Sequence, residues 1–181
     1  MDRIRAQWAA ARPDLDTSPF AIVGRMGRAA AYFDQAIARC LDEHGLQRGS
    51  WDVLASLRRN GPPYERSPTQ LYRGLMRSSG ALTHRLHRLE RAGLIERAPD
   101  PVDGRGLLVR LTPAGVELVD RILPLHMDNE RRLIAALSSD DRAALERILR
   151  RLLGALEGSD PEPPGRRTGS RGADVGGERG C

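Results

Sequence analysis

Residues 67–113 constrain the fold of this 181-residue chain more than any other stretch. The stretch begins with Ser67-Pro68-Thr69-Gln70, in which a glutamine follows a serine by three residues, as in a helix capping box. This pattern predicts a short helix through Leu75. The next three residues, 76–78, are expected to form a tight turn rather than to extend the helix.

A second, amphipathic helix is expected after the turn. Ser78 is expected to cap it, and Gly93 to end it after Ala92, because glycine is favoured just beyond a helix C-terminus. Three leucines at helical spacing form an apolar face, and the other face carries small, hydrogen-bonding and basic side chains. The leucines are Leu82, Leu86 and Leu89, and the other face comprises Ala81, Thr83, His84, Arg85, His87 and Arg88.

Two strands are predicted next. Ile95–Pro99 and Leu107–Leu111 are joined by the turn-forming segment DPVDGRG. A short helix, a tight turn, an amphipathic helix and two strands with a basic loop together predict a winged helix-turn-helix. The expected fold class is mainly α, with a two-stranded wing.

The remaining segments predict helices on both sides of this unit. They are expected over a short N-terminal stretch that ends at Pro13, from Ser18-Pro19 to about residue 43, and over residues 49–59, 113–137 and 139–156. The last helix carries an apolar stripe of Leu145, Ile148, Leu149, Leu152, Leu153 and Leu156. Residues 158–181 are rich in glycine and proline, and we expect them to be disordered. The chain thus divides into an added N-terminal helix and linker (1–17), a central domain (18–157) and a tail (158–181).

Positive charge is concentrated in the middle third of the chain. All 29 basic residues are arginines. Residues 58–110 contain 11 of them against 5 acidic residues, whereas the segments before and after are close to neutral. A localised basic patch is typical of a nucleic-acid site, although a solvated basic face would carry the same charge.

Several other classes of protein are disfavoured. No apolar run approaches the roughly 18–20 residues of a membrane-spanning helix, and the start MDRIRAQW lacks the apolar segment of a signal peptide. With only Cys40 and Cys181 there is no disulfide framework, so we expect a cytoplasmic, nucleoid-associated protein. The sequence shows no set of metal ligands, no paired nucleophile and base, and no phosphate-binding loop. An enzyme is therefore not indicated, and no cofactor is expected. Cys40 fits a small core residue better than a redox sensor.

The candidate DNA contacts lie on the two central helices and the wing. An α-helix fits the major groove, where base edges present donors, acceptors and thymine methyls. Thr83, His84 and His87 are candidates for base edges, and Arg85 and Arg88 for phosphate or guanine. Thr69 and Gln70, at a helix N-terminus, suit a phosphate contact. We also expect Ser79 to contact DNA. Arg105 at the wing tip is expected to enter a minor groove, with Asp103 bracing it.

The stretch SPTQLYRGLMRSSGALTHRLHRLERAGLIERAPDPVDGRGLLVRLTPAG resembles the DNA-binding lobe of the MarR (multiple antibiotic resistance regulator) family. Its segment DGRGLLVRLTPAG matches the family's wing pattern, an Asp-x-Arg followed by a strand and a Leu-Thr-x-x-Gly helix start. The resemblance covers about residues 18–157 and implies a homodimer that spans a palindromic operator in double-stranded DNA. It implies a DNA-binding lobe at about residues 48–112 and dimerisation helices at about 18–45 and 113–157.

Within this family the chain is similar to a urate-responsive branch with an added N-terminal helix that carries a tryptophan. The similarity lies in RIRAQW, RPDLDTSP and SWDVLASLRR. The branch's urate-binding set corresponds here to Trp8, Asp52, Arg85 and Arg97. An arginine fork suits a flat purine anion, and an indole offers a stacking face. The resemblance therefore implies a repressor whose operator binding is attenuated by urate or a related purine.

Other interpretations stay open. Trp8 alone fits a packing residue, and Asp52 alone fits a first-turn residue favoured by the helix dipole. The effector could instead be a different phenolic or xenobiotic anion. A ligand-blind DNA-binding protein is a further alternative, and it would bind with steep salt dependence and little sequence preference.

Overall fold

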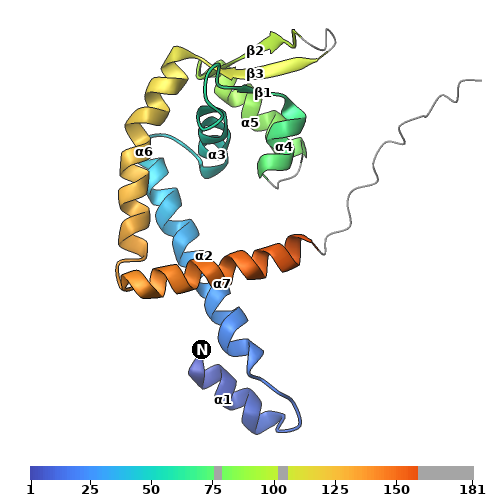
Figure 1. The fold of residues 1–181 in the computed structure, drawn as a ribbon, viewed down its shortest axis with the longest axis vertical. Helices are drawn as coiled ribbons and strands as arrows, with labels where there is room; N and C mark the ends of the chain where they lie inside the picture. Colours follow the sequence, from blue (N-terminus) through green and yellow to red (C-terminus); the bar gives the residue numbers. More distant parts are fainter. Residues whose placement is uncertain (76–78, 102–105, 159–181) are drawn as a thin grey trace, which may run out of the picture. The chain divides into compact units, whose positions relative to one another are not determined.

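The computed structural model describes residues 1–75, 79–101 and 106–158 of the chain (Figure 1). In chain order its elements are α1 (Asp2–Ala11), α2 (Pro19–Asp42), α3 (Arg48–Arg58), β1 (Glu65–Arg66), α4 (Pro68–Leu75), α5 (Ser79–Arg91), β2 (Ile95–Pro99), β3 (Leu107–Leu111), α6 (Pro113–Leu133) and α7 (Ser139–Glu157). They divide into two compact units, Met1–Ala136 and Leu137–Cys181, and each is described by itself. The predicted turn at residues 76–78 and the predicted disordered tail from residue 159 onward lie outside the described residues.

The core of the first unit forms around α3. Trp51, Leu54 and Leu57, which the sequence places on one face of this helix, are at most 4% exposed. The predicted apolar face of α5 is also confirmed, because its three leucines are 2–5% exposed. Both faces belong to one apolar cluster that includes residues of the sheet and of α6. Burial of a side chain of this size contributes about 1.5–3 kcal/mol, so this cluster fixes α5 and the sheet on α3.

The sheet has three antiparallel strands in the order β1-β3-β2. Strands β2 and β3 have the predicted bounds, and they pair from Ile95 with Leu111 to Pro99 with Leu107. The predicted two-stranded wing of β2 and β3 is therefore confirmed, and Glu65–Arg66 adds a short, unpredicted third strand on the other side of β3. Arg110 of β3 lies 2.6 Å from the carboxylate of Glu65, so an ion pair supports this added strand.

The predicted helices are confirmed, with corrections at their ends. The helix expected at 113–137 ends at Leu133, because Ile134 leaves the helical region at φ −108° and ψ 13°. Ser18 is the N-cap residue of α2 and Pro19 its first residue, as predicted, but the Ser18 side chain makes no capping hydrogen bond and instead donates to Asp16. Gly93 ends α5 as predicted, with a positive φ of 68° that glycine adopts without strain.

The described part of the second unit is α7 and its cap. The helix begins at Ser139 as predicted, and Ser138 is its N-cap, which forms a capping box with Asp141. Hydrogen bonds from the Ser138 hydroxyl and backbone N–H lower the pKa of the Asp141 carboxyl. Much of the predicted apolar stripe is exposed, with Leu145, Ile148, Leu153 and Leu156 at 41–59%.

Of the helices that the structure describes, none combines the length and the apolar character that crossing a membrane requires.

Candidate nucleic-acid interface and ligand cavity

The polar face of α5 is the first candidate surface. Because its leucines turn inward, Thr83, His84 and His87 lie on the exposed side of the helix. His84 and His87 line a shallow groove together with Arg88 and Arg91. This arrangement leaves hydrogen-bonding side chains on a helix face that can enter a major groove. The predicted contacts Asp103 and Arg105, and the side chain of Ser79, lie outside the described residues.

The N-terminus of α4 has the predicted capping box. The Ser67 backbone N–H donates to the Gln70 side-chain oxygen at 2.9 Å, and the Gln70 backbone N–H donates to the Ser67 hydroxyl at 3.2 Å. Gln70 therefore uses its carbonyl oxygen to cap the helix, and its amide nitrogen is the group that a phosphate would meet. Thr69 is exposed beside it. The assignment of both residues to DNA contact stays a prediction.

Two arginines of α5 turn toward the start of α3. Arg88 donates hydrogen bonds to the Gln47 side-chain oxygen at 2.6 Å and to the Ser50 hydroxyl at 2.7 Å. The guanidinium of Arg85 lies so close to Gly49 that a Cβ at this glycine would be 2.4 Å from Arg85 Nε. The sequence predicts that both arginines contact DNA and that Arg85 also binds urate, but no local pattern in it indicates these contacts with α3.

Arg97 projects from β2 toward α5. Its Nε lies 3.3 Å from a carboxylate oxygen of Glu90, and its Nη2 lies 3.5 Å from His87 Nδ1. The side chain is 29% exposed. Arg97 therefore links β2 to α5, and it neighbours one of the candidate base-reading histidines.

Trp8 lies apart from the other three members of the predicted urate set. Helix α1 lies against the N-terminal half of α2, and Asp2 pairs with Arg25 at 2.6 Å (Figure 1). The other end of α2 is the one that leads to α3. Trp8 is 48% exposed on α1. Within one chain, the structure brings Asp52 and Arg85 to the first turns of α3 but does not bring Trp8 to them.

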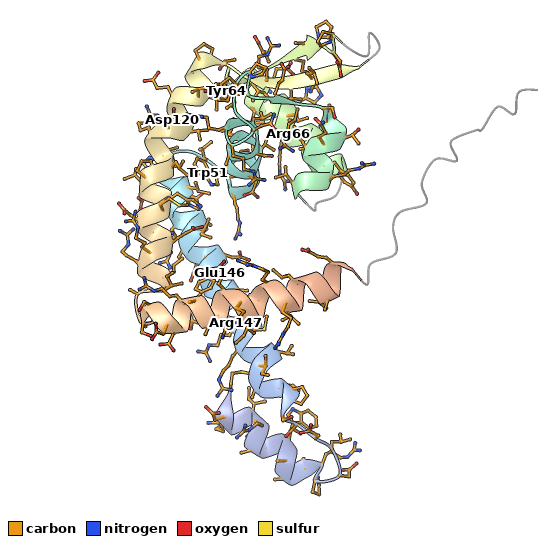
Figure 2. All side chains as sticks on the ribbon, viewed as in Figure 1. Trp51, Tyr64, Arg66, Asp120, Glu146 and Arg147 are labelled. Atoms are coloured by element: carbon orange, nitrogen blue, oxygen red, sulfur yellow. The ribbon has the colours of Figure 1, made fainter. Side chains whose placement is uncertain are left out.

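A cavity of about 620 Å³ lies where α3, the end of α4 and α6 meet. Figure 2 labels Trp51 and Asp120 in this region. Its walls combine apolar side chains with five ionisable ones. The lining residues are Trp51, Asp52, Ala55, Arg58, Arg59, Gly74, Leu75, Val119, Asp120, Leu123, His126 and Met127. Of the predicted urate set, only Asp52 lines this cavity.

An ion pair between α3 and α6 forms part of the cavity wall. Arg58 donates two hydrogen bonds to the Asp120 carboxylate, at 2.8 and 3.1 Å, and its guanidinium lies 4.9 Å from the Tyr64 ring centroid. The hydrogen bonds to Asp120 raise the pKa of Arg58. The sequence gives no signal for this pair, because its members are 62 residues apart.

His126 is the most buried ionisable residue of the cavity wall. It is 7% exposed, its ring meets the Trp51 ring edge-on at 5.2 Å, and its Nε2 lies 3.2 Å from a Glu130 carboxylate oxygen. Its Nδ1 has no hydrogen-bond partner in the part of the chain that the structure describes. A bound molecule with a polar group could satisfy this nitrogen, since buried polar atoms are seldom unpaired.

Two further predictions concern metal and thiol chemistry. Among the described residues, no group of three or more His, Cys, Asp or Glu side chains is placed to hold a metal ion. Burial raises the pKa of the Cys40 thiol, and the nearby Glu43 carboxylate adds to this effect. Both influences disfavour the reactive thiolate.

Comparisons with known proteins agree with this architecture. Residues 44–106 match the model of the MarR family. The chain is 36% identical over 146 residues to the transcriptional regulator PecS of Dickeya dadantii, covering 81% of this chain and 88% of PecS. It is 32% identical to the multiple antibiotic resistance protein MarR of Escherichia coli, covering 71% of this chain and 90% of that protein.

Solved structures show the same fold. AbsC, a MarR family regulator from Streptomyces coelicolor, matches with a TM-score of 0.73 at 24% identity, covering 80% of this chain and 97% of AbsC. A MarR variant from E. coli, crystallised with operator DNA, matches with a TM-score of 0.66 at 30% identity, covering 76% of this chain and 99% of that chain.

Proposed function

Because the chain belongs to the MarR family of DNA-binding transcriptional regulators, we propose that it is a homodimeric repressor whose binding to a palindromic operator is relieved by urate or a related purine. The observation that carries the DNA part is the exposed polar face of α5, held on a buried leucine face beside a sheet of winged-helix topology. The related E. coli MarR structure was obtained with operator DNA.

The charge distribution supports the DNA part of the proposal. The segment that contains α4, α5 and the wing carries 11 arginines against 5 acidic residues. Phosphate neutralisation by such residues supplies most of the salt-dependent affinity for DNA, and base contacts supply the specificity. His84, His87 and Thr83 are the residues proposed to read base edges, with Thr69, Gln70 and Ser79 at the backbone.

Exposed apolar side chains support the homodimer. On α2, Phe20, Ile22 and Val23 are 45–67% exposed, and α7 exposes four residues of its apolar stripe. Apolar surface of this extent on helices indicates a protein interface. A second copy of the chain is the proposed partner, since a two-fold dimer places two α5 helices on the two halves of a palindrome.

The cavity is the proposed place for the effector. A volume of about 620 Å³ falls within the range of small-molecule sites, and its walls mix apolar surface with a few polar groups, as such sites do. Asp52 can accept a hydrogen bond from a ring N–H, and arginines can bind the anion. Since Trp8 lies apart from the cavity within one chain, it can contribute to the site only by movement of α1 or across a dimer.

The test is a urate titration followed in two ways. Release of a fluorescent operator duplex reports the regulatory effect, and tryptophan fluorescence reports binding, because only Trp8 and Trp51 contribute to it. We expect release below millimolar urate and saturable quenching that Trp8→Phe weakens. Quenching that is unchanged in Trp8→Phe would return Trp8 to a packing role.

The same titration separates the alternatives. Operator binding that millimolar urate leaves intact, but that a phenolic anion such as salicylate relieves, would replace urate by another effector class. A third outcome is DNA binding that neither anion changes, that depends steeply on salt concentration and that scarcely distinguishes DNA sequences. It would identify a ligand-blind DNA-binding protein.

A further inference from the structure

We infer that Arg88 is a positioning residue, which orients the DNA-reading helix α5 by holding the first turn of α3, rather than a residue that contacts DNA. This inference rests on the proposed role of α5 as the helix that enters the major groove. It concerns the two hydrogen bonds from Arg88 to Gln47 and Ser50, which we call the α3–α5 clamp.

The clamp is built from strong and directional contacts. Arg88 uses one terminal nitrogen for the Gln47 oxygen at 2.6 Å and the other for the Ser50 hydroxyl at 2.7 Å. Hydrogen bonds from a charged donor are shorter and stronger than neutral ones. With both terminal nitrogens engaged across 38 and 41 residues of sequence, the guanidinium plane is fixed by α3.

Of the two partners of Arg88, Ser50 is buried and Gln47 is exposed. Ser50 is only 2% exposed, so its hydroxyl cannot reach DNA. Gln47 is the N-cap residue of α3, but its side chain makes no capping bond and turns to Arg88 instead. A positive charge near a helix N-terminus is electrostatically unfavourable, so stabilisation of α3 by its dipole does not explain this placement.

The consequence for DNA binding is geometric. The leucines of α5 fix its burial against the core, but apolar contacts are not directional. The clamp adds directional contacts on the side of α5 next to His84 and His87, which share a groove with Arg88. Loss of the clamp should therefore misalign the base-reading side chains without removing a phosphate contact. Trp51 and Asp52 follow Ser50 directly and line the cavity, so the clamp also joins the cavity wall to α5.

The test uses the full-length protein and a labelled duplex selected by the wild-type protein from a random-sequence library. Operator affinity is measured by fluorescence anisotropy over a series of salt concentrations, with a scrambled duplex as the non-specific reference. Ser50→Ala removes one acceptor of the clamp at a residue that DNA cannot touch. We expect about tenfold weaker operator binding, as for loss of one charge-assisted hydrogen bond, with unchanged affinity for the scrambled duplex.

Ser56→Ala is the matched control. Ser56 is also a fully buried serine of α3, but its hydroxyl has no hydrogen-bond partner within the described ranges. This variant should bind the operator like the wild type. Gln47→Ala, at an exposed position, should weaken operator binding by a smaller factor without disturbing the core. Circular dichroism at the assay temperature verifies that each variant is folded.

Salt dependence distinguishes positioning from contact. If Arg88 positions α5, Arg88→Ala weakens operator binding but leaves the slope of log affinity against log salt unchanged. The double variant Ser50→Ala/Arg88→Ala then binds no more weakly than Arg88→Ala, because both changes remove the same contact. A slope reduced by about 0.9 per lost phosphate contact, together with wild-type binding by Ser50→Ala, would overturn the inference. If the wild-type protein selects no duplex, the proposed function fails first and the inference with it.

Discussion

At the scale of single residues, Gly49 determines where Arg85 lies. A Cβ at this position would lie 2.4 Å from Nε and 2.5 Å from Cζ of Arg85, so the flexible guanidinium must move. Gly49→Ala should leave the free energy of unfolding within about 1 kcal/mol of the wild type, since only a side-chain end shifts. If Arg85 binds the effector, as the family resemblance implies, Gly49→Ala should raise the urate concentration needed for operator release, and Arg85→Ala should do the same.

Denaturant unfolding and the release assay measure these two effects. Arg85→Ala is the reference variant, because it removes the same guanidinium outright. A Gly49→Ala protein that responds to urate like the wild type, while Arg85→Ala does not respond, would show that the observed position of Arg85 is not the one that binds the effector.

The Cys40 thiol gives a second residue-scale prediction. Burial and Glu43 raise its pKa, so the thiolate fraction at neutral pH is smaller than in a free cysteine. In a Cys181→Ser protein, alkylation of Cys40 by iodoacetamide should be slower than that of free cysteine at pH 7.5. Its rate should rise with pH, with a midpoint above that of the free amino acid. Fast reaction at neutral pH would restore the redox-sensor interpretation.

Residue types could be predicted from the sequence, but their partners could not. The face of α5 was predictable because helical spacing alone places Leu82, Leu86 and Leu89 together. The Arg88–Ser50 and Arg58–Asp120 contacts join residues 38 and 62 positions apart, and only tertiary packing determines them. For the same reason the four members of the urate set match by residue type but do not form one site within the chain: Trp8 lies on α1, and Arg97 contacts Glu90 and His87.

At the scale of elements, the start of α6 is locked onto the corner between α5 and β2. The Thr112 hydroxyl donates to the Gly93 carbonyl at 2.7 Å and accepts from the Gly115 backbone N–H at 3.1 Å. A Cβ on Gly115 would lie only 2.1 Å from the Leu94 carbonyl oxygen. Unlike the end of a side chain, this backbone oxygen cannot move alone, because Leu94 also accepts the Thr112 N–H.

Gly115→Ala should therefore lower the free energy of unfolding by about 1–3 kcal/mol or more, the usual cost of overpacking a closed site. Urea unfolding measures the change. Gly74→Ala on α4 is the control, since a Cβ there meets nothing within 4 Å. Equal stability of the Gly115 variant and the control would show that α6 can shift away from the corner.

Strong local signals made most elements predictable. Helices with a regular spacing of apolar residues and a glycine or proline at one end were predicted with only small errors in their bounds. The same holds for β2 and β3. Strand β1 was missed because two residues, Glu65 and Arg66, carry no apolar pattern, and their pairing with β3 arises only after the chain folds back. The end of α6 was placed too late because the apolar period continues through Ile134 and Leu137, past the point where the backbone leaves the helix.

At the scale of the whole molecule, the cavity illustrates what a linear pattern cannot contain. Its wall is formed by side chains from α3, α4 and α6. Each helix contributes the side chains on the one of its faces that is turned toward the cavity. The sequence named Asp52 through a family resemblance, but Arg58, Asp120 and His126 became candidates only when the three helices were seen together. Their identification therefore depends on the fold rather than on a motif.

The apolar surface of a single chain argues for a second copy, and α7 offers the clearest test. We expect the wild-type protein to elute with a mass of about 40 kDa, twice that of the 19.9-kDa chain, in size-exclusion chromatography with light scattering. Ile148→Glu places a charge within the exposed apolar stripe, where Ile148 is 49% exposed. Burying an unpaired carboxylate in an interface is costly, so this variant should shift toward monomer and bind the operator at least about tenfold more weakly.

Arg147→Glu is the control for this variant, because it places the same side chain on the opposite face of α7, outside the stripe. It should remain dimeric. The two variants together separate loss of the interface from a general effect of negative charge on DNA binding. Were Ile148→Glu to remain a dimer with wild-type operator affinity, the stripe on α7 would not be the subunit interface, and the exposed face of α2 would be the next candidate.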